Sequence, residues 1–150
     1  MELRDELLTL LQRGDVDTFN QVAQRRQQIV DLSGADLTAA RLEGVDLRGV
    51  RLDRAKLARA RLAAADLEGA SLRFANLEGA DLEGANLSRA NLYNAYLADA
   101  RLEGALLLDA DITAAVFPAD LRADEIALAV DRGTRVRHDP LVALLRHLRA

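Results

Sequence analysis

The residues best suited to acid–base or metal chemistry are few in this sequence. Its two histidines, His138 and His147, stand near the C-terminus, and no set of further ligands surrounds them at metal-binding spacing. There is no cysteine, which excludes disulfides and thiolate metal sites. No nucleophile motif and no glycine-rich phosphate loop is present. We therefore expect a protein that is not an enzyme and that holds neither a cofactor nor a metal ion.

Charge and hydropathy limit the partners further. The sequence has 24 acidic and 20 basic residues, which gives a formal net charge of −4. Binding to nucleic acid through its phosphates needs an excess of basic residues, so we expect no direct nucleic-acid binding. The first residues, MELRDELL, lack the basic-then-apolar pattern of a signal peptide. No apolar run approaches the roughly 18–20 residues that span a bilayer. We expect a cytoplasmic protein without membrane contact.

A five-residue repeat occupies most of the chain. Leu stands at every fifth position from Leu32 to Leu107, and Ile112 and Phe117 continue the series. Ala or Val stands two residues before each of these 18 positions, usually with Asp, Asn or Arg in between. A period of five fits neither a helix nor a simple strand. It fits a polygon in which each unit forms one side, with the two apolar residues inward and the others toward water.

Glycine indicates where such a polygon turns. It occurs two positions after the Leu in several units, as in Leu67-Glu68-Gly69. Glycine adopts positive φ angles at no steric cost, which suits a tight turn. We therefore expect a corner with positive φ at this position of each unit.

Tandem A(D/N)LXX units, such as Ala35-Asp36-Leu37 and Ala85-Asn86-Leu87, closely resemble the pentapeptide-repeat family. The resemblance covers residues 30–119. It implies an all-β solenoid, a right-handed quadrilateral β-helix with four units per coil. On that basis the 18 units make about 4.5 coils, and the ~4.8 Å spacing of paired strands gives a length of roughly 22 Å.

The flanking segments are predicted to be α-helical caps, because the open ends of a β-solenoid aggregate unless they are covered. The pattern predicts helices over 2–12 and 16–28, separated by Gly14. It predicts a further helix over 122–131, an extended segment over 134–137 and a last helix from Asp139-Pro140. The last helix either folds onto the final coil or forms a homodimer, through the apolar stripe Leu141, Leu144, Leu145 and Leu148. The predicted divisions are 1–29, 30–119 and 120–150.

With the family's four sides, residues 20 apart stack on one face, and two outward clusters emerge. The first is an aromatic corner, which is a candidate protein-contact patch or merely local stacking: Arg73, Phe74, Tyr93 and Tyr96. The second is a basic coil, which is either functional or a solvated face: Arg48, Arg51, Arg54, Lys56, Arg59 and Arg61. Outward apolar residues near the end of the repeats, Leu106, Leu108 and Val116, predict that the C-terminal segment covers them.

Two functions follow as hypotheses. The leading one is a non-catalytic scaffold for protein–protein interaction, acting as a monomer or homodimer. The alternative comes from the resemblance, because some members of the family mimic DNA. Those members bind type II topoisomerases, DNA gyrase or topoisomerase IV, and protect them from quinolones. The residues for that role are outward acids, which otherwise solvate the surface and bond to nearby backbone: Asp46, Asp66, Glu68, Glu78, Asp81 and Glu83. A repeat protein without a specific ligand is the third reading.

Overall fold

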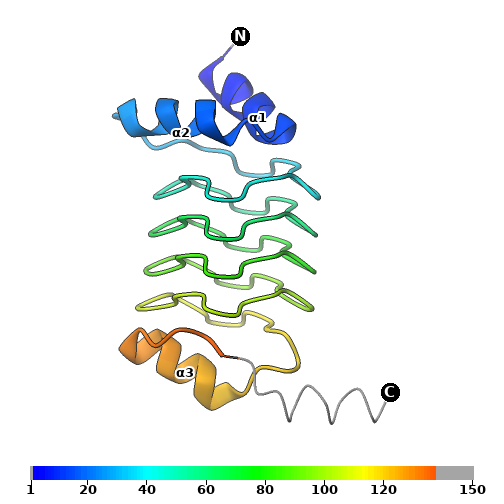
Figure 1. The fold of residues 1–150 in the computed structure, drawn as a ribbon, viewed down its shortest axis with the longest axis vertical. Coiled ribbons are helices and arrows are strands. Elements are labelled where there is room, and N and C mark those ends of the chain that lie inside the picture. The colour runs from blue at the N-terminus through cyan, green and yellow to red at the C-terminus, as the bar shows by residue number, and fades with distance from the viewer. Residues whose placement is uncertain (1, 138–150) are drawn as a thin grey trace.

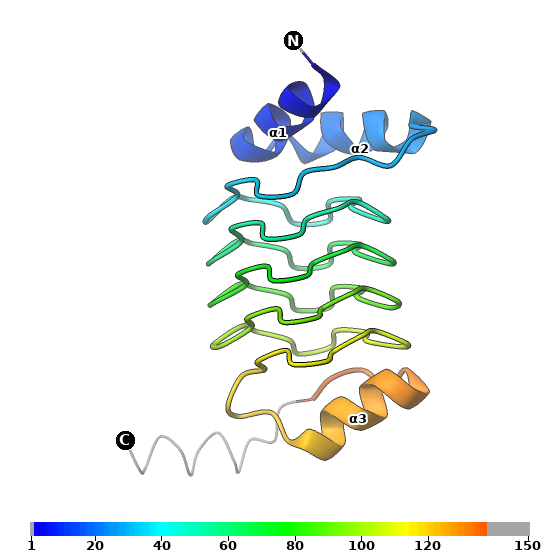
Figure 2. The same cartoon turned by 180° about the vertical axis from the view of Figure 1, so that it is seen from behind.

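The structure is a computed structural model that describes residues 2–137. It contains the helices α1 (Leu3–Arg13), α2 (Val16–Arg25) and α3 (Ala123–Arg132). Between α2 and α3 the chain winds into a stack of similar coils (Figure 1). Figure 2 shows from behind that α1 and α2 lie across one end of the stack and α3 across the other. Among the described residues, no helix is long and apolar enough to cross a membrane.

Parallel bridges define the coils. They join residues 20 positions apart, from Asp31–Arg51 to Tyr96–Val116. Four five-residue units therefore complete one turn. We name the four sides faces A, B, C and D, after the inward residues of the first coil: Leu32, Leu37, Leu42 and Leu47. Backbone hydrogen bonds join successive coils on every face, as between Leu32 N–H and Arg51 O at 2.7 Å.

The interior is built from one repeated shape. Each Leu from Leu32 to Leu107 is at most 1% exposed, and the Ala or Val two positions before it at most 8%. No polar or charged side chain is buried within residues 2–137. Burial of one Leu contributes about 1.5–3 kcal/mol, so the stacked leucines supply most of the driving force. Such a core needs no aromatic residue to fill irregular space.

The corners of the coils have the predicted conformation. The residue two positions after each Leu has a positive φ, as at Gly69 (66°) and Phe74 (58°). A hydrogen bond closes each turn, for example from Ala35 N–H to Leu32 O at 3.0 Å. Residues other than glycine are strained there by about 1–2 kcal/mol each. The stacked neighbours hold them in place, because the corner N–H groups from Gly34 to Asn94 bond to the next coil, as Phe74 N–H does to Tyr93 O at 2.9 Å.

One side chain of α2 imitates the backbone of a missing coil. The Asn20 amide donates from Nδ2 to Gly44 O at 3.1 Å, and its Oδ1 accepts from Asp46 N–H at 2.8 Å. One coil later, the equivalent N–H of Asp66 donates to Val45 O. Asn20 thus satisfies an N–H that would otherwise be exposed on an open β-edge.

Two further side chains bond to the same end of the stack. Gln12 Nε2 donates to Asp36 O at 3.2 Å, and Arg26 Nη2 donates to Arg48 O at 2.5 Å. Helix α2 ends at Arg25, before the predicted residue 28, because the backbone leaves the helical conformation at Arg26. The backbone of Arg26 is extended (φ −71°, ψ 138°), and it leads the chain down into the first coil.

The other end of the stack is closed mainly by backbone. Val136 N–H donates to Ala105 O at 2.9 Å, and its carbonyl accepts from Gly104 N–H at 2.8 Å. Asp109 N–H donates to Val130 O at 2.9 Å. The segment 134–137, predicted to be extended, therefore pairs with the last coil although it is not a regular strand.

The C-terminal elements agree with the predicted pattern where they are described. Helix α3 begins and ends one residue later than predicted, and Gly133, whose φ is 67°, caps its C-terminus. Gly133 lies beside the side chain of Leu108, and Leu106 and Leu108 are half-buried. Val116 stays 46% exposed, so the prediction that it is covered is wrong. The predicted last helix, with Leu141, Leu144, Leu145 and Leu148, lies outside the described residues, as do both histidines.

Candidate protein-contact surface

An arginine–aromatic cluster lies at the corner between faces A and B. The rings of Phe74 and Tyr93 meet edge to face, with centroids 5.6 Å apart and planes at 81°. The Arg54 guanidinium lies over Phe74 at 5.2 Å from the ring centroid. Arg73 lies 5.7 Å from the Tyr93 centroid and 6.0 Å from that of Phe74. Phe74 keeps 44% of its surface exposed. We call Arg54, Arg73, Phe74 and Tyr93 the arginine–aromatic cluster.

A carboxylate fixes the backbone beneath the cluster. Asp53 Oδ1 accepts hydrogen bonds from Ser71 Oγ at 2.5 Å and from Arg73 N–H at 3.1 Å. These bonds join two successive coils on face A. Asp53 therefore bonds within the protein, and its bond to the N–H of Arg73 fixes the backbone that carries the Arg73 side chain.

The cluster differs from the predicted aromatic corner in two residues. Tyr96 belongs to the column Asn76–Tyr96–Val116 on face B. It is 42% exposed and makes no ring contact within residues 2–137. Arg54 was absent from the predicted patch, although its distance of 20 residues from Phe74 is the signal that identifies it. The predicted stacking of Arg73 over Tyr93 rested on that same spacing.

The six predicted acidic residues lie on three faces and are mostly paired with arginine. Asp46 and Asp66 lie 2.8 and 3.8 Å from Arg48 on face D. Glu68, on the same face, lies 3.5 Å from Arg89. On face C, both acids pair with one arginine, in the ion pairs Arg101–Asp81 and Arg101–Glu83. Glu78 stands apart on face B, with no ion pair to any described residue. The acids therefore form no continuous bare stripe.

The basic coil divides in the same way. Arg48 on face D and Arg61 on face C are paired with acids, the latter with Glu43 at 2.6 Å. On faces A and B, the basic residues of this coil have no carboxylate oxygen within 4 Å in the described part of the chain: Arg51, Arg54, Lys56 and Arg59. All four are exposed.

Hydrogen bonding lowers the pKa of several acids. The Arg48 guanidinium is the main cause of the lowered pKa of Asp46, and it donates from Nε at 2.9 Å. On faces A and B, a neighbouring hydroxyl residue is the main cause instead: Ser33 lowers the pKa of Asp31, and Thr38 that of Asp36. Thr113 does the same for Asp111. Hydrogen bonds to the ionised carboxylate favour that form.

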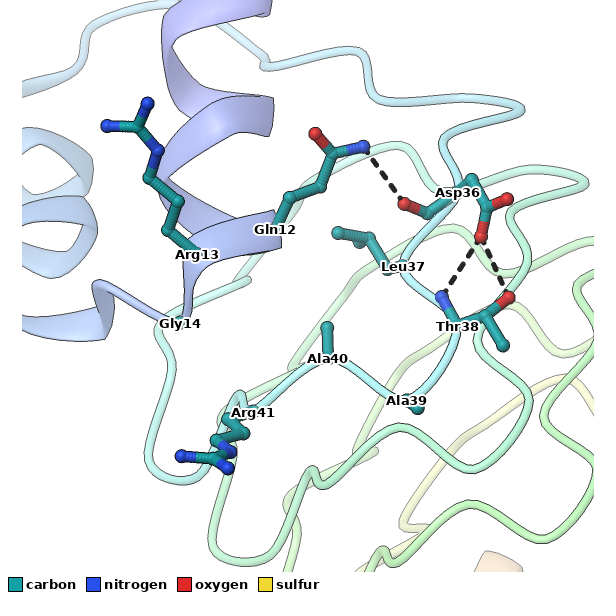
Figure 3. A pocket seen from close by; sticks show the side chains of 9 residues that line it. All are labelled: Gln12, Arg13, Gly14, Asp36, Leu37, Thr38, Ala39, Ala40 and Arg41. Carbon is teal, nitrogen blue, oxygen red and sulfur yellow. Dashed lines mark hydrogen bonds between the residues drawn. The ribbon is translucent and has the colours of Figure 1, made fainter.

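A polar cavity of about 400 Å³ opens beside the end of α1 (Figure 3). Gln12, Arg13 and Gly14 line it on one side and residues 36–41 of the first coil on the other. Figure 3 shows Gln12 bonded across to the backbone of Asp36, whose carboxylate turns back to Thr38. The arginines at its rim, Arg13 and Arg41, point away from each other (Figure 3). The cavity lies where the helices leave this end of the stack uncovered. Its lining residues do not converge on a common point, as the groups of a ligand site would.

No metal centre is formed in the part of the chain that the structure describes. Within residues 2–137 there is no group of three or more His, Cys, Asp or Glu residues arranged to hold a metal ion. The surfaces described above offer charge, aromatic area and hydrogen-bond donors. Those are the means of recognising another molecule.

Comparison with known proteins identifies relatives of the repeat. A family model described as pentapeptide repeats matches in eight copies, over residues 31–69, 51–89 and 90–117. HetL, a pentapeptide-repeat protein involved in heterocyst differentiation regulation in the cyanobacterium Nostoc sp. strain PCC 7120, is 40% identical, with a TM-score of 0.60. The match covers 62% of this chain but only 43% of HetL. No curated protein matches the chain.

Two further solved structures differ widely in their similarity to this chain. Another pentapeptide-repeat protein from Nostoc PCC 7120 is 33% identical, with a TM-score of 0.61 over 73% of this chain and 87% of that one. A trypsin-treated form of QnrB1, a plasmid-mediated fluoroquinolone resistance protein, is 18% identical, with a TM-score of 0.30 over 81% and 86%. A likeness as distant as the second carries no inference about partners.

Proposed function

Because the chain belongs to the pentapeptide-repeat family, whose β-helices are right-handed and generally mediate protein interactions, we propose that it is a non-catalytic scaffold for a protein partner. The partner binds at the arginine–aromatic cluster. The observation that carries this proposal is the exposed Phe74 ring, which lies against Tyr93 and beneath two guanidinium groups.

The composition of the cluster suits a protein interface. Tyr and Arg are enriched among residues that dominate binding energies, and aromatic residues in general are enriched at interface cores. The geometry also lowers the cost of association. Phe74 is held by its corner conformation, and Asp53 fixes the backbone of Arg73. Little conformational freedom is left for the partner to remove.

Affinity capture tests the proposal with a matched control. The full chain, Phe74→Ala and Tyr96→Ala are immobilised and exposed to a lysate of the source organism. The two aromatic side chains are almost equally exposed, at 44% and 42%, but only Phe74 belongs to the cluster. A protein retained by the full chain and by Tyr96→Ala, but lost with Phe74→Ala, supports the proposal. Equal retention by all three, or loss with Tyr96→Ala alone, contradicts it.

The alternative is a DNA mimic that binds a type II topoisomerase and protects it from quinolones. The net charge of −4 favours it, and Glu68 and Glu83 lie on adjacent faces. The arginines paired with five of the six acids count against it, since a mimic presents a bare negative stripe. A gyrase supercoiling assay with and without a quinolone tests the DNA-mimic alternative. Inhibition or drug rescue that disappears in the Asp66→Lys, Glu68→Lys, Asp81→Lys, Glu83→Lys variant supports the mimic. No effect from the folded protein excludes it for gyrase.

The division of the chain into 1–29, 30–119 and 120–150 is part of the proposal. So is a homodimer through the stripe of Leu141, Leu144, Leu145 and Leu148. Light scattering on the full chain and on a chain ending at Arg137 tests the proposed homodimer. A dimer mass seen only for the full chain supports dimerisation through the last 13 residues. Monomers in both samples contradict it.

A further inference from the structure

We propose that the corner between faces A and B recognises an acidic segment of the partner protein. This inference rests on the proposed function and adds the chemistry of the partner. The proposed surface joins the arginine–aromatic cluster to two neighbouring cations, Arg51 on face A and Lys56 on face B. Neither has a carboxylate oxygen within 4 Å among the described residues.

Basic residues on different faces of the solenoid have different partners. Four arginines of faces C and D have a carboxylate oxygen within 4 Å: Arg48, Arg61, Arg89 and Arg101. Arg41 in the first coil is the exception on those faces. On faces A and B, five exposed cations have none among the described residues: Arg51, Arg54, Lys56, Arg59 and Arg73. In the described part of the chain, most basic residues of faces C and D are therefore in direct ion pairs, whereas those of faces A and B are not.

Two acids on these faces, Asp36 and Asp53, are bonded to neutral donors. Asp53 accepts from Ser71 and from the backbone of Arg73. Asp36 accepts from both the N–H and the hydroxyl of Thr38. These neutral donors hold the carboxylates against the wall. Asp36 and Asp31 attract Lys56 and Arg51 only from beyond 4 Å. The N–H groups of these cations can therefore bond to an incoming carboxylate.

Two of the cations on this surface are held in position by aromatic rings. Arg54 and Arg73 lie over the rings of Phe74 and Tyr93. A guanidinium that lies over an aromatic ring can keep its edge N–H groups for bidentate bonds to a carboxylate. The ring next to it offers apolar area to the same segment. An acidic segment that also carries apolar side chains fits both features.

The charge of the whole chain favours a short acidic segment over a nucleic acid. The formal net charge is −4, although this surface is basic. A nucleic acid needs many phosphate contacts for its affinity. A strand long enough to make them would also lie against acidic parts of the protein, which would repel it. A short acidic segment meets the corner alone.

Defined probes test the proposal by fluorescence anisotropy at about 0.15 M ionic strength. The probes are fluorescein-labelled decaglutamate and decathymidylate. The variants are Arg54→Glu/Arg73→Glu at the corner and Arg89→Glu/Arg101→Glu on faces C and D. Both variants change the net charge equally, so long-range effects cancel in the comparison. Circular dichroism verifies that both are folded.

We expect decaglutamate to bind more tightly than decathymidylate. We also expect the corner variant to weaken decaglutamate about tenfold or more, and the control variant less than about threefold. Equal losses in both variants would show that only bulk charge matters and would overturn the proposal. Tighter binding of decathymidylate, or no binding of decaglutamate, would overturn it too. NMR shifts in the unmodified chain provide a check that needs no variant. They should centre on Arg54, Arg73, Phe74 and Tyr93.

The result is separable from that of the capture experiment. If Phe74→Ala loses the partner but decaglutamate does not bind, the scaffold proposal stands and the acidic partner is wrong. If decaglutamate binds at the corner but Phe74→Ala retains every captured protein, the charge preference stands and the proposed contact surface is wrong.

Discussion

The acidic residues of faces A and B, which form one wall of the solenoid, have different partners from those of faces C and D, which form the other wall. On faces C and D, Asp46 and Glu68 pair with arginines. Acids on all four faces accept backbone N–H groups, but on faces A and B Asp36 and Asp53 also bond to a hydroxyl and pair with no basic side chain within 4 Å among the described residues. The backbone ladder and the Leu interior are alike on both sides. The difference therefore lies entirely in the outward residues, where a repeat protein can acquire a binding site without changing its frame.

The largest loss of stability is expected from truncating an interior Leu, and it should be equal on the two walls. Leu72→Ala on face A and Leu82→Ala on face C each remove a side chain with 0% exposure. Each should lower the free energy of unfolding by about 2–5 kcal/mol, through lost burial and the cavity left behind. Urea denaturation measures both. A clear difference between the two variants would contradict the claim that the interior is equivalent on both sides.

That equivalence is what made the frame predictable from sequence. The Leu at every fifth position assigns each residue to the interior, the outer wall or a corner, and Arg73 could be placed over Tyr93 by counting 20 residues. The same count identifies Arg54. Ion pairing was less predictable, because the choice of Arg48 between Asp46 and Asp66 depends on side-chain rotamers. The role of Asn20 was not predictable, because nothing in a helical pattern marks a side chain that replaces backbone.

The cover at the N-terminal end extends the comparison. Asn20 forms two bonds with face C and D residues, Gly44 and Asp46, whereas Gln12 forms one longer bond under face B. Asn20→Ala leaves Asp46 N–H without its partner and should cost about 1–3 kcal/mol. Gln12→Ala should cost about 0.5–1.5 kcal/mol, the net contribution of a single bond. Thermal and urea unfolding of the two variants test the order, and a larger loss for Gln12→Ala would reverse it.

A substitution at the corner should separate binding from stability. Phe74→Gly removes the exposed ring but relieves a positive φ of 58°. The relief of about 1–2 kcal/mol offsets the lost ring contact, about 0.5–1.5 kcal/mol. The free energy of unfolding should change by less than about 1 kcal/mol, while partner capture is lost. Arg89→Gly, at the equivalent corner of face D with φ 59°, is the matched control that should keep the partner. Unfolding of Phe74→Gly in mild urea would instead show that the cluster serves the fold.

The smallest effect concerns acid titration. The pKa values of Asp46 and Asp36 both lie below the ordinary value of 3.8. A lowered pKa in the folded state adds stability above the unfolded pKa, and that stability is lost as the pH falls through the folded pKa. Unfolding should therefore become easier below about pH 4. Carboxyl NMR should show that high salt or Arg48→Ala raises the pKa of Asp46, whereas Asp36, held by Thr38, responds little. A similar response of both would remove the distinction between the walls.

The central claim is that a partner contacts the corner between faces A and B. Amide hydrogen exchange of the chain, alone and bound to a partner captured through Phe74, tests it most directly. Added protection should appear on segments 51–59, 71–78 and 91–96, which form faces A and B in three successive coils, while 41–49 and 81–89 stay unchanged. Protection confined to 41–49 and 81–89 would place the partner on faces C and D and would contradict the account.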